Sequence, residues 1–292
     1  QIGYDEWGRN DRVFDPEGKE TRTIFDDMSR TIATIESRAN LYSTPTSNEI
    51  TWDDQGDSDP DNDNWKVTWP GASANLTDRD RVTTFAYDGN SNVVKRTAHL
   101  NDGSSQVTQY VYATSNSAGG GTMDSLLDSA NLLSAVHYPN ETTGAADTSA
   151  AYTVSYAYNR LGELKGTTDQ NGTRHKITRD SLGRITSDDA ELLGTNIDGS
   201  VREITASFDE HGRIDEVQSL DDTSGVVNAV KFNYTPLHQI QRVYQEHDGA
   251  VSTSGTVSDS VIYSYADAAP SASGGNYSRL SGIQYPQDVL DL

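Results

Sequence analysis

The chain has 292 residues and a formal net charge of −22, because 44 Asp and Glu outnumber 22 Lys and Arg. This charge argues against nucleic acid and anionic membranes as partners, and the absence of cysteine excludes disulfides and thiolate chemistry. No run approaches the ~20 apolar residues of a membrane span. Hydrophobic content is low at 34%, yet there are 15 Tyr against 5 Phe, a composition suited to half-buried sheet faces.

The chain opens on a short motif, Tyr4-Asp5-Glu6-Trp7-Gly8-Arg9, in which an aromatic residue is followed by a polar turn. Similar aromatic-turn units recur at Phe25-Asp26 and Tyr87-Asp88, and extended stretches lie between them. Short strands separated by Gly, Asn and Asp predict an all-β chain built of hairpins. The chain begins inside one such unit and ends shortly after another, so we interpret it as an internal segment of a longer protein.

Residues 44–80 form a polar insertion in this pattern, and they contain alternating carboxylates at Asp57, Asp59, Asp61 and Asp63. Alternating carboxylates in a loop can bind calcium. However, the EF-hand glycine is replaced by Asn62, and Thr68 stands where the last acidic ligand belongs. We therefore predict a solvated acidic loop, with calcium binding as the alternative and no other cofactor.

Two later segments interrupt the strands. Residues 122–129 have the composition of one or two helical turns, and residues 140–151 are polar and small, which is typical of a linker. Beyond them, the run from Tyr156 to Thr186 contains a complete unit: an aromatic strand, a turn at Gly162, a strand, an Asn-Gly turn at Gly172, and a returning strand.

Self-comparison shows that the two halves of the chain repeat each other. Tyr4 to Arg9 match Tyr158 to Glu163 at an offset of 154 residues, and Gly18 and Asp26 match Gly172 and Asp180 at the same offset. Further matches follow in unbroken order to the Tyr-Pro pairs at 138–139 and 285–286. We therefore predict two tandem blocks of roughly 150 residues: residues 1–139 with the insertion, a linker at 140–151, and residues 152–292.

The recurring Gly-Arg pairs indicate how a unit is built. Glycine can adopt the positive φ of a tight turn, the preceding Asp can accept hydrogen bonds from the turn's backbone, and the Arg can meet a carboxylate or lie over a ring. Repetition of these residues is what a stacked array requires, so we interpret them as structural rather than catalytic or binding residues.

The pattern Tyr-Asp-x-x-Gly-Arg resembles the YD-repeat, or RHS-repeat, family, and degenerate copies extend it over nearly the whole chain. The resemblance implies a β-sheet strip that spirals into a hollow shell around a toxin domain, or an extracellular scaffold as in teneurin-like adhesion proteins. The family's self-cleaving core and toxin tip are not recognisable here. The residues that carry the repeat are Tyr4, Asp5, Gly8, Arg9, Phe25, Asp26, Arg30, Tyr87, Asp88, Tyr158, Gly162, Gly172, Asp180, Gly183, Arg184, Phe208, Asp209, Gly212, Arg213, Tyr234 and Tyr265.

Catalytic motifs are not evident in the sequence. Six histidines are scattered singly, and neither a nucleophile elbow nor a phosphate loop is present. We therefore predict a non-enzymatic, extracellular or cell-surface scaffold made of an extended, twisted antiparallel sheet that associates with further repeats or with itself. A binding module that uses insertion 44–80 to recognise a glycan or protein is the alternative, and a carbohydrate-active enzyme is a further one.

Overall fold

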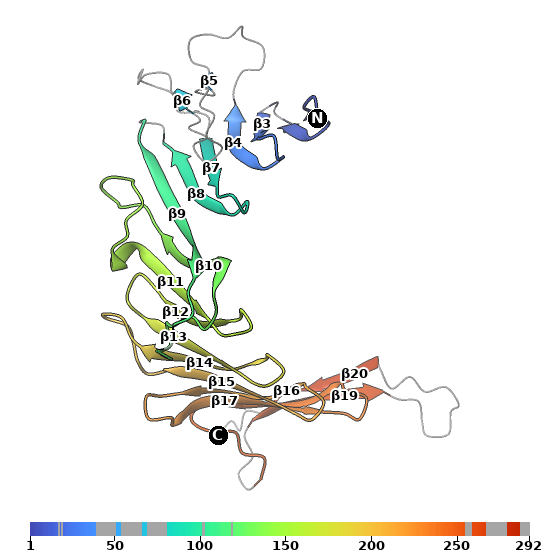
Figure 1. Ribbon diagram of the computed structural model, residues 1–292. Helices are drawn as coiled ribbons and strands as arrows, with labels where there is room; N and C mark the ends of the chain where they lie inside the picture. Colours follow the sequence, from blue (N-terminus) through green and yellow to red (C-terminus); the bar gives the residue numbers. More distant parts are fainter. Residues whose placement is uncertain are drawn as a thin grey trace. The chain divides into compact units, whose positions relative to one another are not determined.

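The computed structural model describes residues 1–16, 18, 20–38, 51–53, 66–68, 81–100, 103–117, 119–254, 259–266 and 279–286. Within these ranges the elements are β-strands apart from one 3-10 turn, η1 (Ala150–Tyr152), and every strand pairing is antiparallel (Figure 1). The predicted all-β antiparallel fold is confirmed.

The chain divides into two compact units, one comprising residues 1–164 with 168–171 and the other residues 165–167 with 172–292. The strands of the first unit are β1 (Ile2–Tyr4), β2 (Asn10–Phe14), β3 (Glu20–Phe25), β4 (Thr31–Arg38), β5 (Thr51–Asp53), β6 (Lys66–Thr68), β7 (Arg81–Tyr87), β8 (Val93–His99), β9 (Ser105–Thr114), β10 (Ser129–His137) and β11 (Thr153–Tyr158). Strand β12 (Leu164–Thr168) contains the boundary between the units.

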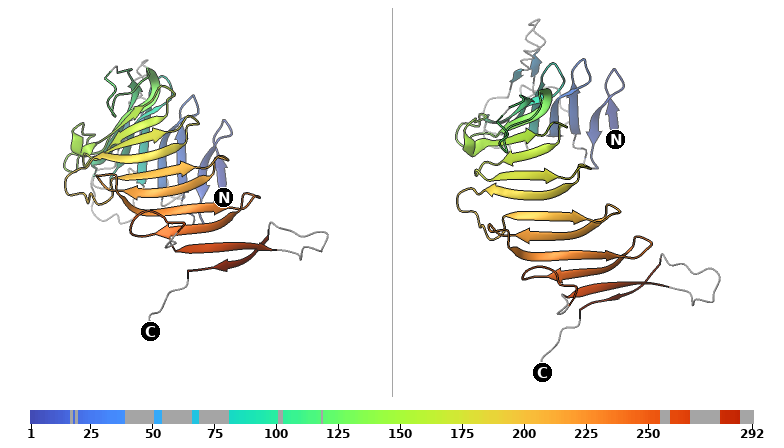
Figure 2. Two further views of the ribbon diagram at one scale, coloured as in Figure 1. Left: turned by 90° about the horizontal axis from the view of Figure 1, so that it is seen from below. Right: turned by 60° about the horizontal axis from the view of Figure 1, so that its bottom comes forward.

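The strands of the second unit are β13 (Arg174–Arg179), β14 (Ile185–Leu192), β15 (Glu203–Phe208), β16 (Ile214–Leu220), β17 (Val226–Tyr234), β18 (Ile240–Glu246), β19 (Ser260–Ala266) and β20 (Arg279–Gln284). Each strand from β13 to β19 pairs with the next strand along the chain. Consecutive hairpins therefore lie side by side in this unit, as the two views of Figure 2 show.

The first unit follows the same rule with one exception. Strand β4 pairs with β7, which places Ala33 opposite Thr84 and Ile35 opposite Val82. The insertion between these strands includes a separate two-stranded pair, β5 with β6. The chain thus returns to the hairpin series after the insertion and continues it without a gap in the sheet.

Side chains on both sheet faces are mostly half-buried. The fully buried apolar positions of the first unit include Ala33, Ile35, Val82 and Ala157, while Ala229 and Tyr244 are buried in the second. Among the described residues, alanine, isoleucine and valine account for every buried apolar side chain except Tyr244. Backbone hydrogen bonds between strands and contacts at the turns therefore hold the strands together to an unusually large extent.

The prediction of helix at residues 122–129 is wrong. This segment forms turns and bends and then enters β10. The Leu126 N–H donates to the Tyr158 carbonyl at 2.9 Å, and the Ser125 hydroxyl accepts from the Tyr158 N–H at 3.2 Å. Bonds to β11 thus take the place of the i to i−4 bonds that a helix would form.

Residues 140–151 form a structured loop on β9 rather than a bare connection. The Asn140 Oδ1 accepts from the Thr142 and Thr143 N–H groups, and the Gly144 carbonyl accepts from the Val107 N–H at 2.8 Å. Gly144 has φ +70°, and an added Cβ would lie 1.9 Å from the Ser105 carbonyl oxygen. This backbone approach requires glycine.

The boundary between the two compact units lies at β12. The division into two sequence-related blocks therefore stays a prediction about internal duplication. Among the described residues, no helix has the length and apolar character needed to cross a bilayer.

Candidate functional site: the arginine turns

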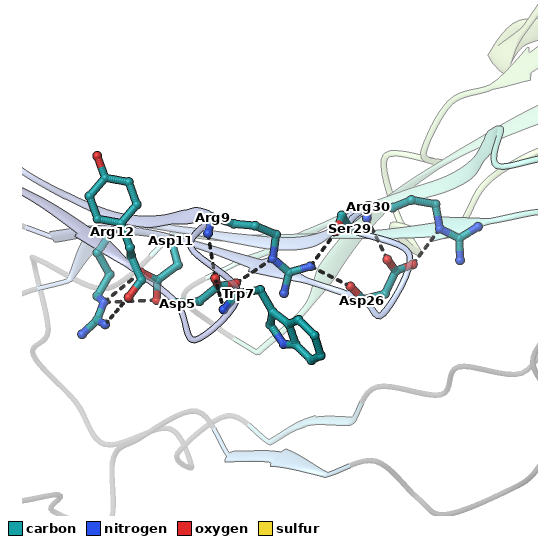
Figure 3. Close-up of polar contacts among 9 residues, drawn as sticks. Asp5, Trp7, Arg9, Asp11, Arg12, Asp26, Ser29 and Arg30 are labelled. Carbon is teal, nitrogen blue, oxygen red and sulfur yellow. Dashed lines mark hydrogen bonds and ion pairs between the residues drawn. The ribbon is translucent and has the colours of Figure 1, made fainter.

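The recurring feature of the structure is a five-residue turn that begins with Asp and ends with Arg. In the turn at residues 5–9, the Asp5 N–H donates to the Arg9 carbonyl at 2.9 Å, and the Gly8 N–H donates to the Asp5 carbonyl at 3.0 Å. The Asp5 Oδ1 accepts from the Trp7 and Arg9 N–H groups at 3.0 and 2.8 Å. One carboxylate therefore closes the turn from inside (Figure 3).

The same backbone bonds recur at residues 26–30, 180–184 and 209–213, and we call these three segments and residues 5–9 the arginine turns. In each, the fourth position has a positive φ: +78° at Gly8, +63° at Ser29, +82° at Gly183 and +80° at Gly212. The adjoining strands show a register shift at this point, as between Ser207 and Phe208. The geometry is that of a hairpin loop with a residue in the left-handed region.

The second carboxylate oxygen of each turn binds the arginine. The Nε of Arg9, Arg30, Arg184 and Arg213 donates to the Oδ2 of the Asp four residues earlier, at 2.6, 2.6, 2.7 and 2.7 Å. Burial opposes ionisation of Asp209, but hydrogen bonds from the Arg213 side chain and from the turn's backbone outweigh it and lower the pKa to about 2. The turn is therefore held by a carboxylate that stays charged.

Each arginine also reaches the next hairpin. The Arg9 guanidinium lies 4.7 Å above the Phe25 ring centroid, while its Nη1 donates to the Asp26 carbonyl and to the Ser29 hydroxyl, both at 3.0 Å. Figure 3 shows this path from Asp5 through Arg9 to the following turn. We call this contact between one turn's arginine and the next hairpin's aromatic residue and turn a clasp.

The clasp recurs with the other arginine turns. Arg30 lies 4.7 Å over Tyr87, Arg184 lies 4.0 Å over Phe208, and Arg213 lies 4.1 Å over Tyr234. Arg30 and Tyr87 are 57 positions apart in sequence, and the pairing of β4 with β7 brings them together. The clasp therefore follows the order of the hairpins in the sheet rather than the distance along the chain.

Tyrosine hydroxyls add a second bond between neighbouring hairpins. Tyr87, Tyr234 and Tyr265 donate to the carbonyls of Thr31, Ile214 and Ile240 at 2.6, 2.8 and 2.8 Å. Each acceptor directly follows the preceding turn. Burial, reinforced by the Asp26 carboxylate and opposed by Arg30, raises the pKa of Tyr87, so its hydroxyl remains a donor. No motif in the sequence indicates that the residue after the turn supplies this acceptor carbonyl.

Other turns keep the backbone and lack the arginine. The turns at 88–92, 159–163 and 235–239 make the same backbone bonds and end in Asn92, Glu163 and Gln239. The Asn92 Nδ2 donates to the Asp88 Oδ2 at 2.9 Å, and the Asn159 Nδ2 donates to Glu163 at 2.7 Å. These side chains close their turns without a ring contact of the kind made by Arg9.

The remaining predicted residues lie as follows. Tyr4 is exposed on β1; Tyr158 donates to the Leu133 carbonyl at 2.7 Å; Gly162 and Gly172 have φ values of +79° and +86°. Asp57, Asp59, Asp61 and Asp63 lie outside the described residues, so the alternative of calcium binding stays a prediction. In the part of the chain that the structure describes, no three His, Asp or Glu side chains gather in a metal-binding arrangement.

Residues that sequence reasoning missed occupy the fourth turn position. Ser29, Ser91 and His238 have φ values of +63°, +64° and +64° where the motif has glycine. The sequence does contain a signal for Ser29: Asp26 and Arg30 align with the Asp and Arg of the Asp-x-x-Gly-Arg pattern, which puts Ser29 at the glycine position. The four arginine turns each contain an Asp–Arg ion pair and a ring contact with the next hairpin, and Arg9 and Arg30 also donate to the backbone of the next turn.

No family model matches the chain, and no curated protein sequence matches it either. Solved structures that resemble it include the TcdB2-TccC3 complex (13% identity, TM-score 0.25) and the same complex without its hypervariable C-terminal region (12%, TM-score 0.25). The Tc holotoxin pore of Photorhabdus luminescens also matches, at 12% identity and TM-score 0.22.

The match to the TcdB2-TccC3 complex covers 90% of this chain and 16% of that one. The match to the complex without the hypervariable region covers 91% and 19%, and the match to the holotoxin pore covers 91% and 18%. The chain thus spans less than a fifth of the proteins it resembles.

Proposed function

We propose that this chain is a structural segment of a large extracellular YD-repeat protein, in which it forms part of the wall of a shell, tube or fibre. The observation that supports this proposal is the recurrence of the clasp, with an Arg of one turn seated on an aromatic ring of the next hairpin. The proposal assigns the chain a mechanical role and no reaction.

The clasps stabilise a sheet whose faces bury little. A cation–π contact contributes about 0.5–1 kcal/mol at partly exposed sites, and a charge-assisted hydrogen bond about 1.5–3 kcal/mol. A series of such contacts fixes each hairpin against the next where apolar burial alone is small. That property suits a long wall built by adding identical units.

The terminal strands of the described sheet indicate how a wall would continue. Strand β20 pairs with β19, and β1 pairs with β2, each through one edge among the described strands. Residues Arg279 to Gln284 of β20 are all exposed. A strand with a free edge accepts a further strand, so we propose that more repeats of the same or a longer chain cover these edges.

Electron microscopy of the native, unfragmented parent protein tests the function. A hollow capsule or a filament, lost when the four clasp arginines are changed to Gln, is the expected result. A second measurement uses the present chain alone in sedimentation at micromolar concentration, where we expect association. A compact, stable monomer that keeps its melting temperature after the four substitutions would refute a wall made by clasped repeats.

A second candidate function is binding to another protein at a cell surface. The third position of five of the turns carries an exposed apolar side chain: Trp7 is 75% exposed, Met28 66%, Leu161 83%, Leu182 76% and Leu237 60%. Repeated exposed apolar side chains are typical of contact surfaces. If this candidate is correct, Leu161→Gln with Leu182→Gln abolishes cell adhesion and leaves the melting temperature unchanged. Insertion 44–80, the other candidate recognition region, lies mostly outside the described residues.

A further inference from the structure

The clasp of Arg213 differs from the others in its acceptor. In the clasps of Arg9 and Arg30, the guanidinium meets a serine hydroxyl at the fourth position of the next turn: Ser29 at 3.0 Å and Ser91 at 3.3 Å. In the clasp of Arg213 the same position is His238, and the Arg213 Nη1 lies 2.9 Å from its Nδ1. An imidazole, whose ring nitrogen can accept a hydrogen bond or bind a proton, has replaced a hydroxyl group.

The protonation state that His238 needs for this contact follows from the donor, Arg213. A guanidinium carries only N–H donors and does not lose its charge in proteins. The His238 Nδ1 must therefore be the acceptor, which requires a neutral imidazole with its proton on Nε2. Protonation at Nδ1 removes the acceptor and leaves two cations at the distance of a hydrogen bond.

The groups around His238 favour this response to acid. His211, at the third position of the preceding turn, lies edge-on to the His238 ring with centroids 4.9 Å apart. The Glu210 carboxylate lies 3.8 Å from the His211 Nδ1 and is 87% exposed, so solvent screens its charge. Asp209 is already bonded to Arg213 at 2.7 Å. The Tyr234 ring, neutral near pH 7, covers the other side of the guanidinium.

We propose that the Arg213 clasp is an acid-sensitive latch between the β15–β16 hairpin and the β17–β18 hairpin. It is closed when the His238 Nδ1 is unprotonated and opens when acid places a proton there; histidine is the residue type whose charge changes between about pH 8 and 5. The closed latch binds fewer protons than the open one, so its stability rises with pH across this range. The serine clasps of Arg9 and Arg30 lack this dependence.

Amide hydrogen exchange of the complete 292-residue chain tests the latch, with intrinsic rates corrected for pH. The probes are the N–H of His238, which donates to the Thr235 carbonyl at 2.9 Å, and the N–H of Thr235, which donates to the Gln239 carbonyl at 2.8 Å. Between pH 7.5 and 5.5 we expect protection at both amides to fall about tenfold, the order expected for loss of a charge-assisted bond. The Ser29 amide in the matched serine clasp keeps its protection.

Two variants separate the latch from general acid sensitivity. His238→Ser copies the serine clasps and should make protection at residue 235 independent of pH. Ser29→His should transfer the dependence to the Arg9 clasp. A tenfold loss that persists in His238→Ser overturns the proposal, as does a Ser29→His variant whose 26–30 turn does not respond to pH.

A spectroscopic measurement on the unaltered protein covers the case in which His238→Ser does not fold. Nitrogen NMR of the imidazole at pH 7.5 should show His238 with an unprotonated Nδ1 and a protonated Nε2. A proton on Nδ1 at that pH would exclude the bond from Arg213 and overturn the latch.

Discussion

The turns at residues 26–30 and 88–92 stand next to each other in the hairpin series; both have Asp at the first position and Ser at the fourth, but one ends in Arg30 and the other in Asn92. Their backbones are the same: Asp26 donates to the Arg30 carbonyl at 2.9 Å, Asp88 donates to the Asn92 carbonyl at 3.0 Å, and Ser29 and Ser91 have nearly equal φ. Arg30 extends to the ring of Tyr87, whereas Asn92 donates to Asp88 and, at 3.2 Å, to Asn131.

This comparison shows that closing a turn and joining two hairpins need different residues. An Asp and a residue with positive φ are sufficient to close the loop, because all the bonds involved lie within five residues. The clasp needs a long side chain with a flat cationic end, which can bind its own Asp through Nε and still cover a ring. Asn92 has too few bonds along its side chain to do both.

The largest expected effect comes from removing the long side chain. Arg30→Ala should lower the free energy of unfolding by about 2 kcal/mol, because it removes a cation–π contact and leaves the largely buried Asp26 carboxylate without its ion-pair partner. Asn92→Ala, the matched change, should cost about 0.5–1 kcal/mol. Urea unfolding measures both. Equal losses would show that the clasp adds nothing to the turn.

Acid should act on the arginine turns through their carboxylates. The pKa of Asp209 is about 2 in the folded chain, below the ordinary aspartate value of 3.8, so its stabilising contribution is present above about pH 4 and is lost as the pH falls toward 2. In Asp209→Asn, the pH dependence of the melting temperature between pH 4 and 2 should flatten. Asp215→Asn, outside a turn, serves as the control. An unchanged profile in Asp209→Asn would contradict the role of this carboxylate.

The tyrosine hydroxyl divides the clasps into two kinds. Tyr87→Phe should cost about 1 kcal/mol, because the Thr31 carbonyl loses a donor at 2.6 Å while the ring contact with Arg30 remains. Phe208→Tyr makes the reverse change in the Arg184 clasp and should stabilise that unit. Thermal unfolding of the two variants compares them. The idea fails if both substitutions shift the melting temperature in the same direction.

The smallest expected effect is the creation of a clasp. Strand β9 pairs with β8, with Gln109 opposite Lys95, and the same register continued by three residues brings Tyr112 toward Asn92 at the end of the 88–92 turn. Asn92→Arg should therefore gain about 0.5 kcal/mol, a ring contact diminished by the cost of ordering the new side chain. The urea midpoint measures the change, with Asn92→Lys as a control that lacks the flat guanidinium. Equal midpoints for the two variants would indicate that charge, not the clasp, matters.

The sequence predicted the all-β class and the positions of the turns because their signals are local. The bonds of the turn at 209–213 join residues at most four apart, so Asp-x-x-Gly-Arg is visible in a single segment. The segment 122–129 was misassigned as helical, because its composition does not reveal that Leu126 and Ser125 bond to Tyr158 on a later strand.

The sequence by itself thus determined where the chain turns and which carboxylate closes each turn. Only the tertiary structure decided which ring each arginine covers, because that choice depends on strand pairing: Arg30 reaches Tyr87 past an intervening insertion. The tertiary structure also brought His238 to the position of a serine in the Arg213 clasp. Contacts between hairpins depend on register, and register is set by the whole sheet rather than by any one segment.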